Sequence, residues 1–491
     1  MNKILFSLAA CTVLSGCATS YVGGVYSGYS SQAVGPRDIF LSIDGTGNNQ
    51  LSRTNAARLF EIVESNSGNA PRELVTYYAE GVGSNGSIKG LTAGVGMSRD
   101  IKEAFAFLAQ TYDPKGRLFL SGFSRGAYAV RALAGMIAVG GIPDMRTWDA
   151  DDRQNAIDAL FDAYKIKRRT IDGRQESIAA HNGRRLRRME RVAAKYGFQL
   201  RGANGQTRVT AMAIWDTVEA LGAPDFTMSP DEKVSHYYLA PCNVDHVFHA
   251  LALDDNRAYS FTPIFATGKT MGQSCPDASK KPKVEEVWFA GAHADVGGSY
   301  APGNRLHGHI PGVSLNWILD HLRQFNLFDP DARVFADPMG PVHDAIRYSV
   351  VYKPLSEHYR YPMAYHDKAG SVGRPRVHFT AFERLARVGS LDRAYPQCPQ
   401  SKDNPGPTLL CARQIANFGL VEELTKNNCM DELMDEKGEL VGYELRKGQS
   451  CVSVVCQEPT DSRFCSAEYA PAHSLSPEDK SAALPRPGMG F

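Results

Sequence analysis

The chain of 491 residues carries 54 Lys and Arg against 53 Asp and Glu, and 43% of its residues are hydrophobic. This near-neutral balance excludes a global electrostatic field that would draw the protein to nucleic acid. The length accommodates one large α/β core with an appendage, or two to four smaller domains.

The first residues have the features of an export signal. Lys3 supplies a positive charge, and the apolar run from Ile4 to Leu14 fits the core of a signal peptide, which is about 7–15 residues long. The run is too short to span a membrane, which takes about 20 residues. It ends in Leu14-Ser15-Gly16-Cys17, which resembles the lipobox of bacterial lipoproteins. We therefore expect a signal peptide over residues 1–16 and acylation of Cys17, with a plain secretory signal as the alternative.

An acylated Cys17 would anchor the chain to membrane lipids, because several acyl chains on one residue hold stably where a single chain is marginal. Ala18 follows the cysteine in place of Asp, which favours the outer membrane in this class of lipoprotein. The sequence thus predicts a lipoprotein of the bacterial envelope that faces the periplasm or the cell surface. Residues 17–36 are rich in Gly, Ser and Tyr without a regular pattern, and are predicted to form a tether.

Residues 37–390 are predicted to form an α/β domain. Short apolar runs alternate there with helical patterns, as in a mostly parallel sheet wrapped by helices. The expected strands are Ile39–Ile43, Leu74–Tyr78, Leu118–Ser121, Val209–Trp215 and Val287–Phe289.

A G-x-S-x-G pentapeptide, Gly122-Phe123-Ser124-Arg125-Gly126, follows the third expected strand. A helical stripe continues it, formed by Ala127, Val130, Ala134 and Ile137. A strand, a sharp turn and a helix are what a nucleophile elbow requires, and glycines flank the serine because the turn leaves no room for side chains. We predict that Ser124 is a nucleophile and that the Arg125 backbone N–H faces a developing oxyanion. A purely structural turn is the alternative.

About residues 144–205 are predicted to form a helical insertion between two core strands. Two apolar stripes mark its helices: Ile157, Leu160, Phe161 and Tyr164, then Leu186, Met189, Ala193 and Tyr196. The second helix carries a basic set on its other faces: Arg184, Arg185, Arg187, Arg188, Arg191 and Lys195. One interpretation is a solvated helical pair packed by its apolar side, and the other is a basic lid that faces a membrane.

A serine hydroxyl needs a base that is itself oriented by an acid, and in the α/β-hydrolase fold the chain order is serine, acid, histidine. Asp216 directly follows the strand Val209–Trp215, and His293 lies in a Gly-rich loop after Val287–Phe289. Side chains at the carboxyl ends of such strands point into one crevice. The sequence therefore predicts an α/β-hydrolase-like fold with a Ser124–Asp216–His293 triad and no cofactor.

The stretch Asp44-Gly45-Thr46 follows the first expected strand. No Gly-Lys-Ser/Thr follows it, which disfavours a phosphate-binding NTPase loop. The backbone N–H groups of Gly45 and Thr46 are candidates for the second oxyanion donor, with a structural turn as the alternative.

Two histidine pairs, His246/His249 and His307/His309, have a spacing that could serve a metal ion. Neither pair lies in a pattern with a carboxylate that would supply a third ligand. We therefore predict no metal site.

Residues 391–473 are predicted to form a Cys-rich extension. Its six cysteines are Cys398, Cys411, Cys429, Cys451, Cys456 and Cys465, and Cys242 and Cys275 bring the total outside the signal and lipobox to eight. An even number in an exported chain predicts disulfides, with metal binding as the alternative. Residues 474–491 have little apolar content and are predicted to be disordered.

Six motifs together resemble a known family. They are Ile43-Asp44-Gly45-Thr46-Gly47-Asn48-Asn49; Tyr77-Tyr78 through Gly81-Val82-Gly83; Gly122-Phe123-Ser124-Arg125-Gly126-Ala127; Ile214-Trp215-Asp216-Thr217-Val218; His249-Ala250-Leu251-Ala252-Leu253-Asp254; and Val287-Trp288-Phe289 through Gly298. In this order they resemble the α/β-hydrolase catalytic domain of the Tle-type phospholipase effectors of type VI secretion. The resemblance implies that Ser124, Asp216 and His293 form the triad, and it implies nothing past about residue 390.

The predicted function is a serine hydrolase that cleaves carboxylic esters, with phospholipid acyl esters as the leading substrate. A toxin injected by its producer has no use for a lipobox, so this chain is not expected to be a delivered effector. Fold and triad do not decide the substrate. The alternatives are an esterase for soluble or cell-wall acyl esters, and a catalytically silent envelope lipoprotein with a binding or scaffolding role.

Overall fold

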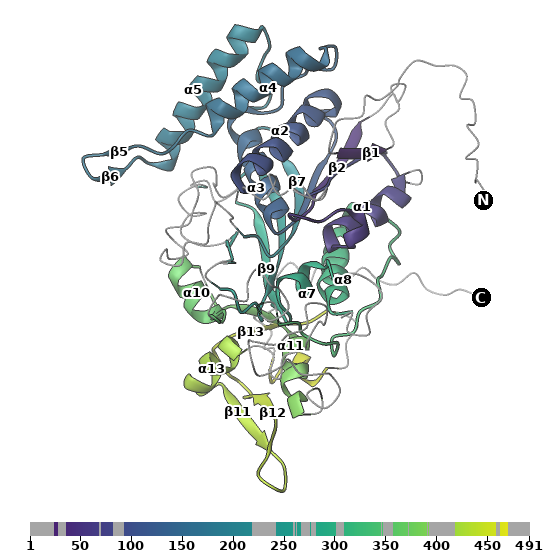
Figure 1. The fold of residues 1–491 in the computed structure, drawn as a ribbon, viewed down its shortest axis with the longest axis vertical. Helices are drawn as coiled ribbons and strands as arrows, with labels where there is room; N and C mark the ends of the chain where they lie inside the picture. Colours follow the sequence, from purple (N-terminus) through teal and green to yellow (C-terminus); the bar gives the residue numbers. More distant parts are fainter. Residues whose placement is uncertain are drawn as a thin grey trace, which may run out of the picture.

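A computed structural model describes the chain at residues 24–27, 36–67, 70–81, 93–218, 242–258, 261, 263–266, 275, 281–300, 309–344, 346, 357–371, 373–389, 391, 418–457 and 462–469. In these residues one nine-stranded sheet forms the centre of the molecule, and helices cover both of its faces (Figure 1). The expected signal peptide, Cys17 and the expected disordered tail lie outside the described residues. None of the described helices combines the length and the apolar content that crossing a bilayer requires.

The sheet is mostly parallel and α/β-hydrolase-like, which confirms the predicted fold class. Its strands lie in the order β1-β3-β2-β4-β7-β8-β9-β10-β13. Among the described strands of this sheet, only β1 is antiparallel to its neighbour, and all other pairs are parallel. In spatial order the strands are β1 Gly24–Ser27, β3 Glu73–Ala79, β2 Arg37–Ile43, β4 Leu118–Phe123, β7 Val209–Trp215, β8 Val244–Ala252, β9 Lys283–Phe289, β10 Arg376–His378 and β13 Ser453–Val455.

The central strands are apolar on both sides because helices cover both faces of the sheet. In β2, Ile39 and Leu41 belong to the core beneath one layer of helices, while Phe40 belongs to the core beneath the other. In β4, Leu120 and Phe119 divide in the same way. The first layer contains α2 Ala93–Thr111 and α3 Arg125–Gly140, and the second contains α1 Asn55–Ser65 and α8 Pro311–Leu322.

The chain reverses its direction of travel across the sheet at β2. From β2 it passes through α1 to β3 on one side, and from β3 through α2 to β4 on the other side of β2. Loops that leave such a switch point diverge and open a crevice at the carboxyl ends of the strands. The start of α3 lies close to the end of β2, because a Cβ on Gly126 would lie only 2.1 Å from the Ile43 carbonyl oxygen.

The predicted insertion is a pair of helices joined by a small hairpin. The helices are α4 Ala150–Tyr164 and α5 Ile178–Tyr196, and the hairpin is β5 Thr170–Ile171 with β6 Arg174–Gln175. The side chains of Asp149 and Ser177 cap the two helix starts, and α5 ends at Gly197 in the left-handed conformation that glycine favours. The predicted apolar stripes pack into the same core as α2 and α3, which supports the interpretation of a helical pair packed by its apolar side.

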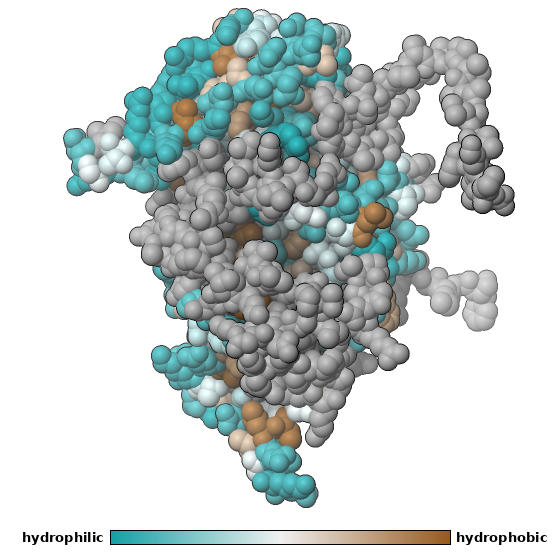
Figure 2. All heavy atoms as spheres, viewed as in Figure 1, coloured by the Kyte–Doolittle hydropathy of each residue, from teal (hydrophilic) through white to brown (hydrophobic). Residues whose placement is uncertain are grey.

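Two of the six basic residues of α5 make contacts within the insertion and are less exposed than the other four. Arg185 is fully buried, with its guanidinium 4.3 Å from the centre of the Tyr164 ring. Arg184 binds the Glu176 carboxylate and donates to the Lys167 carbonyl at 2.7 Å. The remaining four are exposed: Arg187, Arg188, Arg191 and Lys195. The face of α4 and α5 seen in Figure 2 is accordingly mostly hydrophilic.

The C-terminal part of the chain joins the same core. β13 pairs in parallel with β10, with Val454 opposite Val377, and therefore completes one end of the central sheet. Leu420 and Leu424 share a hydrophobic cluster with Trp288 of β9. The other elements of this part are α13 Phe418–Lys426 and the hairpin of β11 Met430–Met434 with β12 Leu440–Leu445. The sequence predicted the extension but not its strand in the main sheet, because β13 has only three residues.

Three disulfides are present in the described residues: Cys242–Cys275, Cys429–Cys451 and Cys456–Cys465. They confirm the predicted pairing of cysteines for four of the six in the extension. Cys398 and Cys411 lie outside the described residues.

All five expected strands are confirmed, with modest differences at their ends; β9, for example, begins at Lys283 and not at Val287. β8 was not predicted as a strand. The structure also differs from the expected tether, since residues 24–27 form the edge strand β1. An edge strand needs only backbone pairing with one neighbour, so its sequence carries no alternating signal. Further short helices are η1 Gln50–Ser52, α7 His293–Gly297, η5 Arg323–Phe325, α10 Pro362–Ala369, α11 Phe379–Leu385 and η6 Arg463–Cys465.

Replacing Cys429 and Cys451 together by Ser should lower the free energy of unfolding by about 3 kcal/mol, as expected for a bridge across a loop of this size. The two residues are 22 apart in sequence. Denaturant unfolding of the purified chain measures the change, with Ser450→Ala at an exposed neighbouring position as the control. Unchanged stability, or free thiols at both positions in non-reducing mass spectrometry, would contradict this pairing.

Candidate active site

Ser124 lies in a sharp turn between β4 and α3. Its backbone has φ 58° and ψ −123°, a conformation that non-glycine residues rarely adopt and that costs about 1–3 kcal/mol. The turn is held because the Ser124 N–H donates to the Trp215 carbonyl at 3.0 Å. Neighbouring side chains would not fit, since a Cβ on Gly122 would lie 2.7 Å from the Gly126 carbonyl carbon. This is the strand–turn–helix geometry that the pentapeptide predicted.

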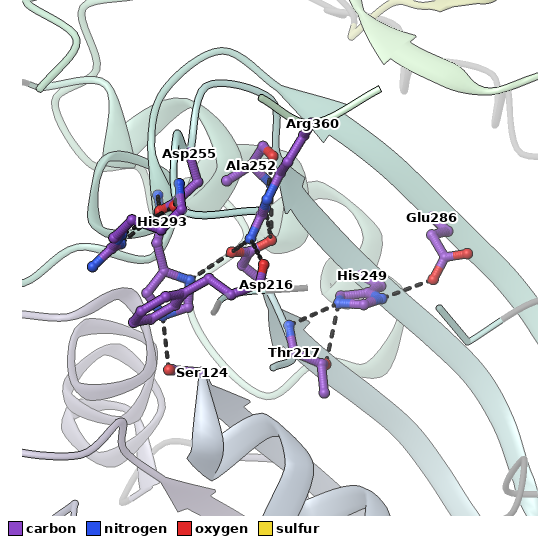
Figure 3. A network of polar contacts seen from close by, with 11 residues as sticks. Ser124, Asp216, Thr217, His249, Ala252, Asp255, Glu286, His293 and Arg360 are labelled. Carbon is purple, nitrogen blue, oxygen red and sulfur yellow. Dashed lines mark hydrogen bonds and ion pairs between the residues drawn. The ribbon is translucent and has the colours of Figure 1, made fainter. Parts of the chain in front are cut away.

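His293 follows β9 and begins the short helix α7. Its Nε2 lies 2.7 Å from Ser124 Oγ, and its Nδ1 lies 2.5 Å from Asp216 Oδ2 (Figure 3). The ring is held between two aromatic side chains, with centroid distances of 4.6 Å to Phe123 and 4.9 Å to Phe261. One imidazole therefore connects the serine and the acid, which are contributed by different strands.

Asp216 directly follows β7 and is fully buried. Its N–H donates to the Ala250 carbonyl at 2.7 Å, and its Oδ1 accepts the Ala252 N–H at 3.0 Å. The neighbouring strand β8 thus fixes both the backbone and the side chain of the acid. The structure brings together all three predicted triad residues, although Ser124 and His293 are 169 residues apart in sequence.

The charges in the site favour a neutral histidine beside an ionised aspartate. Burial alone would raise the pKa of Asp216, but the Arg360 charge and the bond to His293 outweigh it and lower this pKa from 3.8 to about 2. Burial also lowers the pKa of His293 below 6.5, against the opposing pull of Asp216 and Asp255. At neutral pH His293 can then donate from Nδ1 to Asp216 and accept the Ser124 hydroxyl proton at Nε2, which is the arrangement of a general base.

Arg360 is a functional candidate that sequence reasoning missed. Its Nη1 donates to Asp216 Oδ1 at 2.7 Å and its Nη2 to Asp216 Oδ2 at 3.0 Å (Figure 3). The same nitrogens donate to the carbonyls of Ala252 at 2.7 Å and Phe261 at 2.5 Å. Arg360 is 144 residues from Asp216 and lies in no recognisable motif, so no local signal could have identified it.

A second buried ion pair lies beside His293. Asp255 accepts the backbone N–H of His293 at 3.1 Å, and the Arg257 guanidinium donates to both Asp255 oxygens at 3.0 and 2.6 Å. Burial would raise the pKa of Asp255, but the Arg257 and Arg360 charges hold it well below its usual range. The motif around His249–Asp254 ends one residue before this carboxylate, and was the only signal that pointed toward it.

The described histidines among those considered as metal ligands make other contacts. His246 and His249 are three residues apart in β8, and an odd spacing places side chains on opposite faces of a sheet. His249 bonds Glu286 at 2.8 Å and Thr217 at 3.1 Å (Figure 3). His309 packs against the Phe335 ring, and His307 lies outside the described residues. Within the part of the chain that the structure describes, no three His, Cys, Asp or Glu side chains are grouped to hold a metal ion.

The loop after β2 lies next to the serine. A Cβ on Gly45 would lie 3.2 Å from Ser124 Cβ, and Arg125 is the first residue of α3. The Gly45 N–H, however, donates to Asp44 Oδ1 at 2.6 Å. Gly45 is therefore a poorer oxyanion donor than the sequence suggested, and Thr46 remains the candidate beside Arg125.

Asp44 anchors this loop and was not predicted to do so. Its Oδ2 accepts the hydroxyls of Thr54 at 2.6 Å and Tyr78 at 2.5 Å. Burial raises the pKa of Asp44 to about 6, although the bonds from Thr54, Tyr78 and Gly45 oppose the shift. The carboxylate ties the end of β2 to α1 and β3, and so holds Gly45 and Thr46 against the serine.

A family model for the catalytic domain of Tle1-like phospholipase effectors of type VI secretion matches residues 37–321. The chain belongs to this family. This confirms the resemblance seen in the sequence, and membership makes the protein a hydrolase of the lipase and esterase class. Residues after 321, Arg360 among them, lie outside the match.

Other similarities are more distant. An uncharacterized protein of Saccharomyces cerevisiae is 29% identical over 127 residues, which are 22% of this chain and 18% of the yeast protein. An uncharacterized protein from Pseudomonas aeruginosa has a crystal structure with 18% identity and a TM-score of 0.34, covering 61% of this chain and 47% of that one. The carboxylesterase Cest-2923 from Lactobacillus plantarum gives 13% identity and a TM-score of 0.32, covering 62% and 93%. At these values structural similarity carries no argument about activity.

Proposed function

We propose that this protein is a serine hydrolase that cleaves carboxylic esters with Ser124 as nucleophile, His293 as base and Asp216 as the acid that orients the base. The observation that carries the proposal is the unbroken line of hydrogen bonds from Ser124 Oγ through His293 to Asp216. Supporting it, Ser124 is held in a strained backbone conformation at the turn between β4 and α3. A catalytically silent scaffold would need neither the strain nor the buried charges.

The proposed reaction has an acylation step and a deacylation step. Ser124 Oγ attacks the ester carbonyl carbon while its proton moves to His293 Nε2, and Asp216 stabilises the imidazolium that forms. The negative charge on the carbonyl oxygen is met by the backbone N–H groups of Arg125 and Thr46. The bond between the carbonyl carbon and the alcohol oxygen then breaks as His293 protonates that oxygen. The alcohol leaves, and the acyl group remains on Ser124 Oγ as an acyl-serine. Water attacks the acyl-serine while its proton moves to His293. The bond from the acyl carbon to Ser124 Oγ then breaks, His293 returns the proton to Ser124 Oγ, and the carboxylic acid leaves.

Phospholipid acyl esters are the substrate class that we propose. The family is named for phospholipase effectors, and the expected acylation of Cys17 would hold the enzyme within reach of lipid. The exposed basic set of α5, Arg187, Arg188, Arg191 and Lys195, would be attracted to the anionic surface of a membrane. An esterase for soluble or cell-wall acyl esters is the alternative, and substrate comparison separates the two.

Ser124→Ala should abolish ester hydrolysis and leave the fold intact, because a triad loss lowers kcat by about 10⁴–10⁶. The test compares the purified chain and the variant on phospholipid vesicles and on a short soluble ester, with circular dichroism to verify folding. Ser121→Ala, at a buried serine of the same strand, is the control and should retain activity. Near-normal turnover by folded Ser124→Ala protein would rule out the proposed nucleophile. Hydrolysis of the soluble ester alone would favour the alternative substrate.

Changing Arg187, Arg188, Arg191 and Lys195 to Gln should reduce activity on anionic vesicles and spare a short soluble ester. Each basic residue near an anionic surface contributes about 1 kcal/mol, and added salt should shrink the wild-type advantage. Arg184 and Arg185 stay unchanged because they are internal supports. The matched control neutralises four exposed residues of the C-terminal part, whose elements α13, β11 and β12 lie at the opposite end of Figure 1 from α4 and α5: Lys426, Lys437, Lys447 and Arg463. Equal losses in both variants, or no loss in either, would refute the docking role of α5.

We also propose that Cys17 is acylated and anchors the protein in the bacterial envelope, on the strength of the sequence Leu14-Ser15-Gly16-Cys17. Cys17→Ser should move the protein from the detergent-extracted membrane fraction to the soluble fraction and prevent lipobox-type processing. Fractionation followed by mass spectrometry of the processed chain measures both effects. Unchanged fractionation with an unchanged processed mass would sink this proposal.

A further inference from the structure

The segment that carries Arg360 comes from outside the region matched by the family model and is fixed from two sides. On one side, the backbone N–H of His358 donates to the Asn256 carbonyl at 2.9 Å, and the His358 carbonyl accepts the Ala258 N–H at 3.0 Å. The segment therefore runs beside the loop that follows β8. On the other side, α13 approaches so closely that a Cβ on Gly419 would lie 1.9 Å from the Arg360 carbonyl oxygen. The backbone at Arg360 is thereby held in place, and the Arg360 side chain reaches Asp216 in the catalytic centre.

We propose that Arg360 is a positioning residue for the reaction. Its guanidinium donates to both oxygens of Asp216, orients the carboxylate toward His293 and balances the negative charge of the buried site. The inference rests on the proposed function, since it assigns Arg360 a role in the same triad. Arg360 touches neither Ser124 nor the reacting ester, so its effect passes through Asp216.

The first part of the argument is geometric. A planar guanidinium that donates two parallel bonds to a carboxylate fixes the plane of that carboxylate as well as its distance. Asp216 Oδ1 is taken by Arg360 and the Ala252 N–H, and Oδ2 is shared between Arg360 and His293. The carboxylate has one orientation that satisfies all four donors, and in it Oδ2 lies 2.5 Å from His293 Nδ1.

The second part is a charge balance. The groups that face His293 are Ser124, Asp216 and Asp255, with Arg257 and Arg360 bound to the two carboxylates. Behind them, Asp254 accepts the Gly291 N–H, and Asp295 of α7 is paired with His343. The charges of the two carboxylates and the two guanidiniums next to the imidazole add up to zero. Removing Arg360 leaves one negative charge unbalanced in a buried site, and such sites take up a proton instead.

The direction of the resulting pH effect follows. Hydrolysis needs His293 neutral and Asp216 ionised, so activity falls as the pH drops through the point at which the pair binds a proton. Without Arg360, the extra negative charge favours that proton and the pair binds it at higher pH. The proton can reside on His293 or on Asp216, since the two titrate as one unit. In both states Ser124 loses its base, so the acid limb of the pH profile moves up.

The test measures the pH dependence of Ser124 labelling by a fluorophosphonate probe, alongside kcat and KM for a soluble ester, in the purified full chain. Arg360→Gln should move the acid limb of both profiles upward by about 1 to 3 pH units, the effect of losing a nearby opposite charge. Arg360→Lys should keep the limb near that of the wild type and lower kcat, because it retains the charge and loses the two-point grip. KM should change little in either variant.

Arg384→Gln is the matched control. Arg384 is also a buried arginine, and it donates to the Pro338 and Gly340 carbonyls away from the triad. Its loss should reduce stability and leave the acid limb in place. An unmoved limb in folded Arg360→Gln protein would overturn the inference. If that variant does not fold, Arg360→Lys decides, and a kcat equal to that of the wild type would overturn it.

Failure of the proposed function looks different. A wild-type chain whose Ser124 is not labelled at any pH would refute the triad itself. Labelling without hydrolysis of any ester would refute the proposed substrate class. The pH dependence of Ser124 labelling in the Arg360 variants would then still test the role of Arg360.

Discussion

The register of four parallel strands is the constraint on which the site depends. Phe123 of β4 pairs with Trp215 of β7, Trp215 pairs with Ala250 of β8, and Ala252 pairs with Phe289 of β9. Ser124 and Asp216 are therefore the first residues past two aligned strand ends. The ladder continues through them, since each donates its N–H to a carbonyl of the next strand. A slip by one residue would turn every side chain of a strand to the other face and would separate the serine from the acid. Alternate residues of one strand pack into different cores, Leu120 beneath one helix layer and Phe119 beneath the other, and the packing that fixes the register therefore also fixes the triad.

The parts of the structure that the sequence predicted are those with a local signal. Strands β2, β4 and β7 are buried on both faces and appear as continuous apolar runs, and the glycines around Ser124 mark a turn with no room for a Cβ. The triad could be named because each of its members directly follows or closely follows such a run. The apolar stripes of α4 and α5 were also visible, because helical spacing persists over several turns.

The parts that the sequence did not predict depend on contacts between distant segments. Arg360 is an ordinary arginine until the fold places it against Asp216, and β13 is a three-residue strand whose identity comes from its neighbour β10. The sequence also did not show which basic residues of α5 are exposed. Arg184 and Arg188 are both charged residues on one helix, yet one is bound to Glu176 and the other is exposed. Which of them could reach a membrane is decided by tertiary packing.

The close approach of α13 to the Arg360 segment has a consequence for biosynthesis. A ribosome that has reached residue 391 has already made the entire region matched by the family model, the three triad residues and Arg360 itself. It has not yet made Gly419, against which the Arg360 backbone rests, nor the strand that completes one end of the sheet. The emerging chain therefore contains the triad and Arg360 before it contains the helix that packs against the Arg360 backbone. Residues 418–457, which are synthesised later, contribute the helix beside the Arg360 backbone and the strand that pairs with β10.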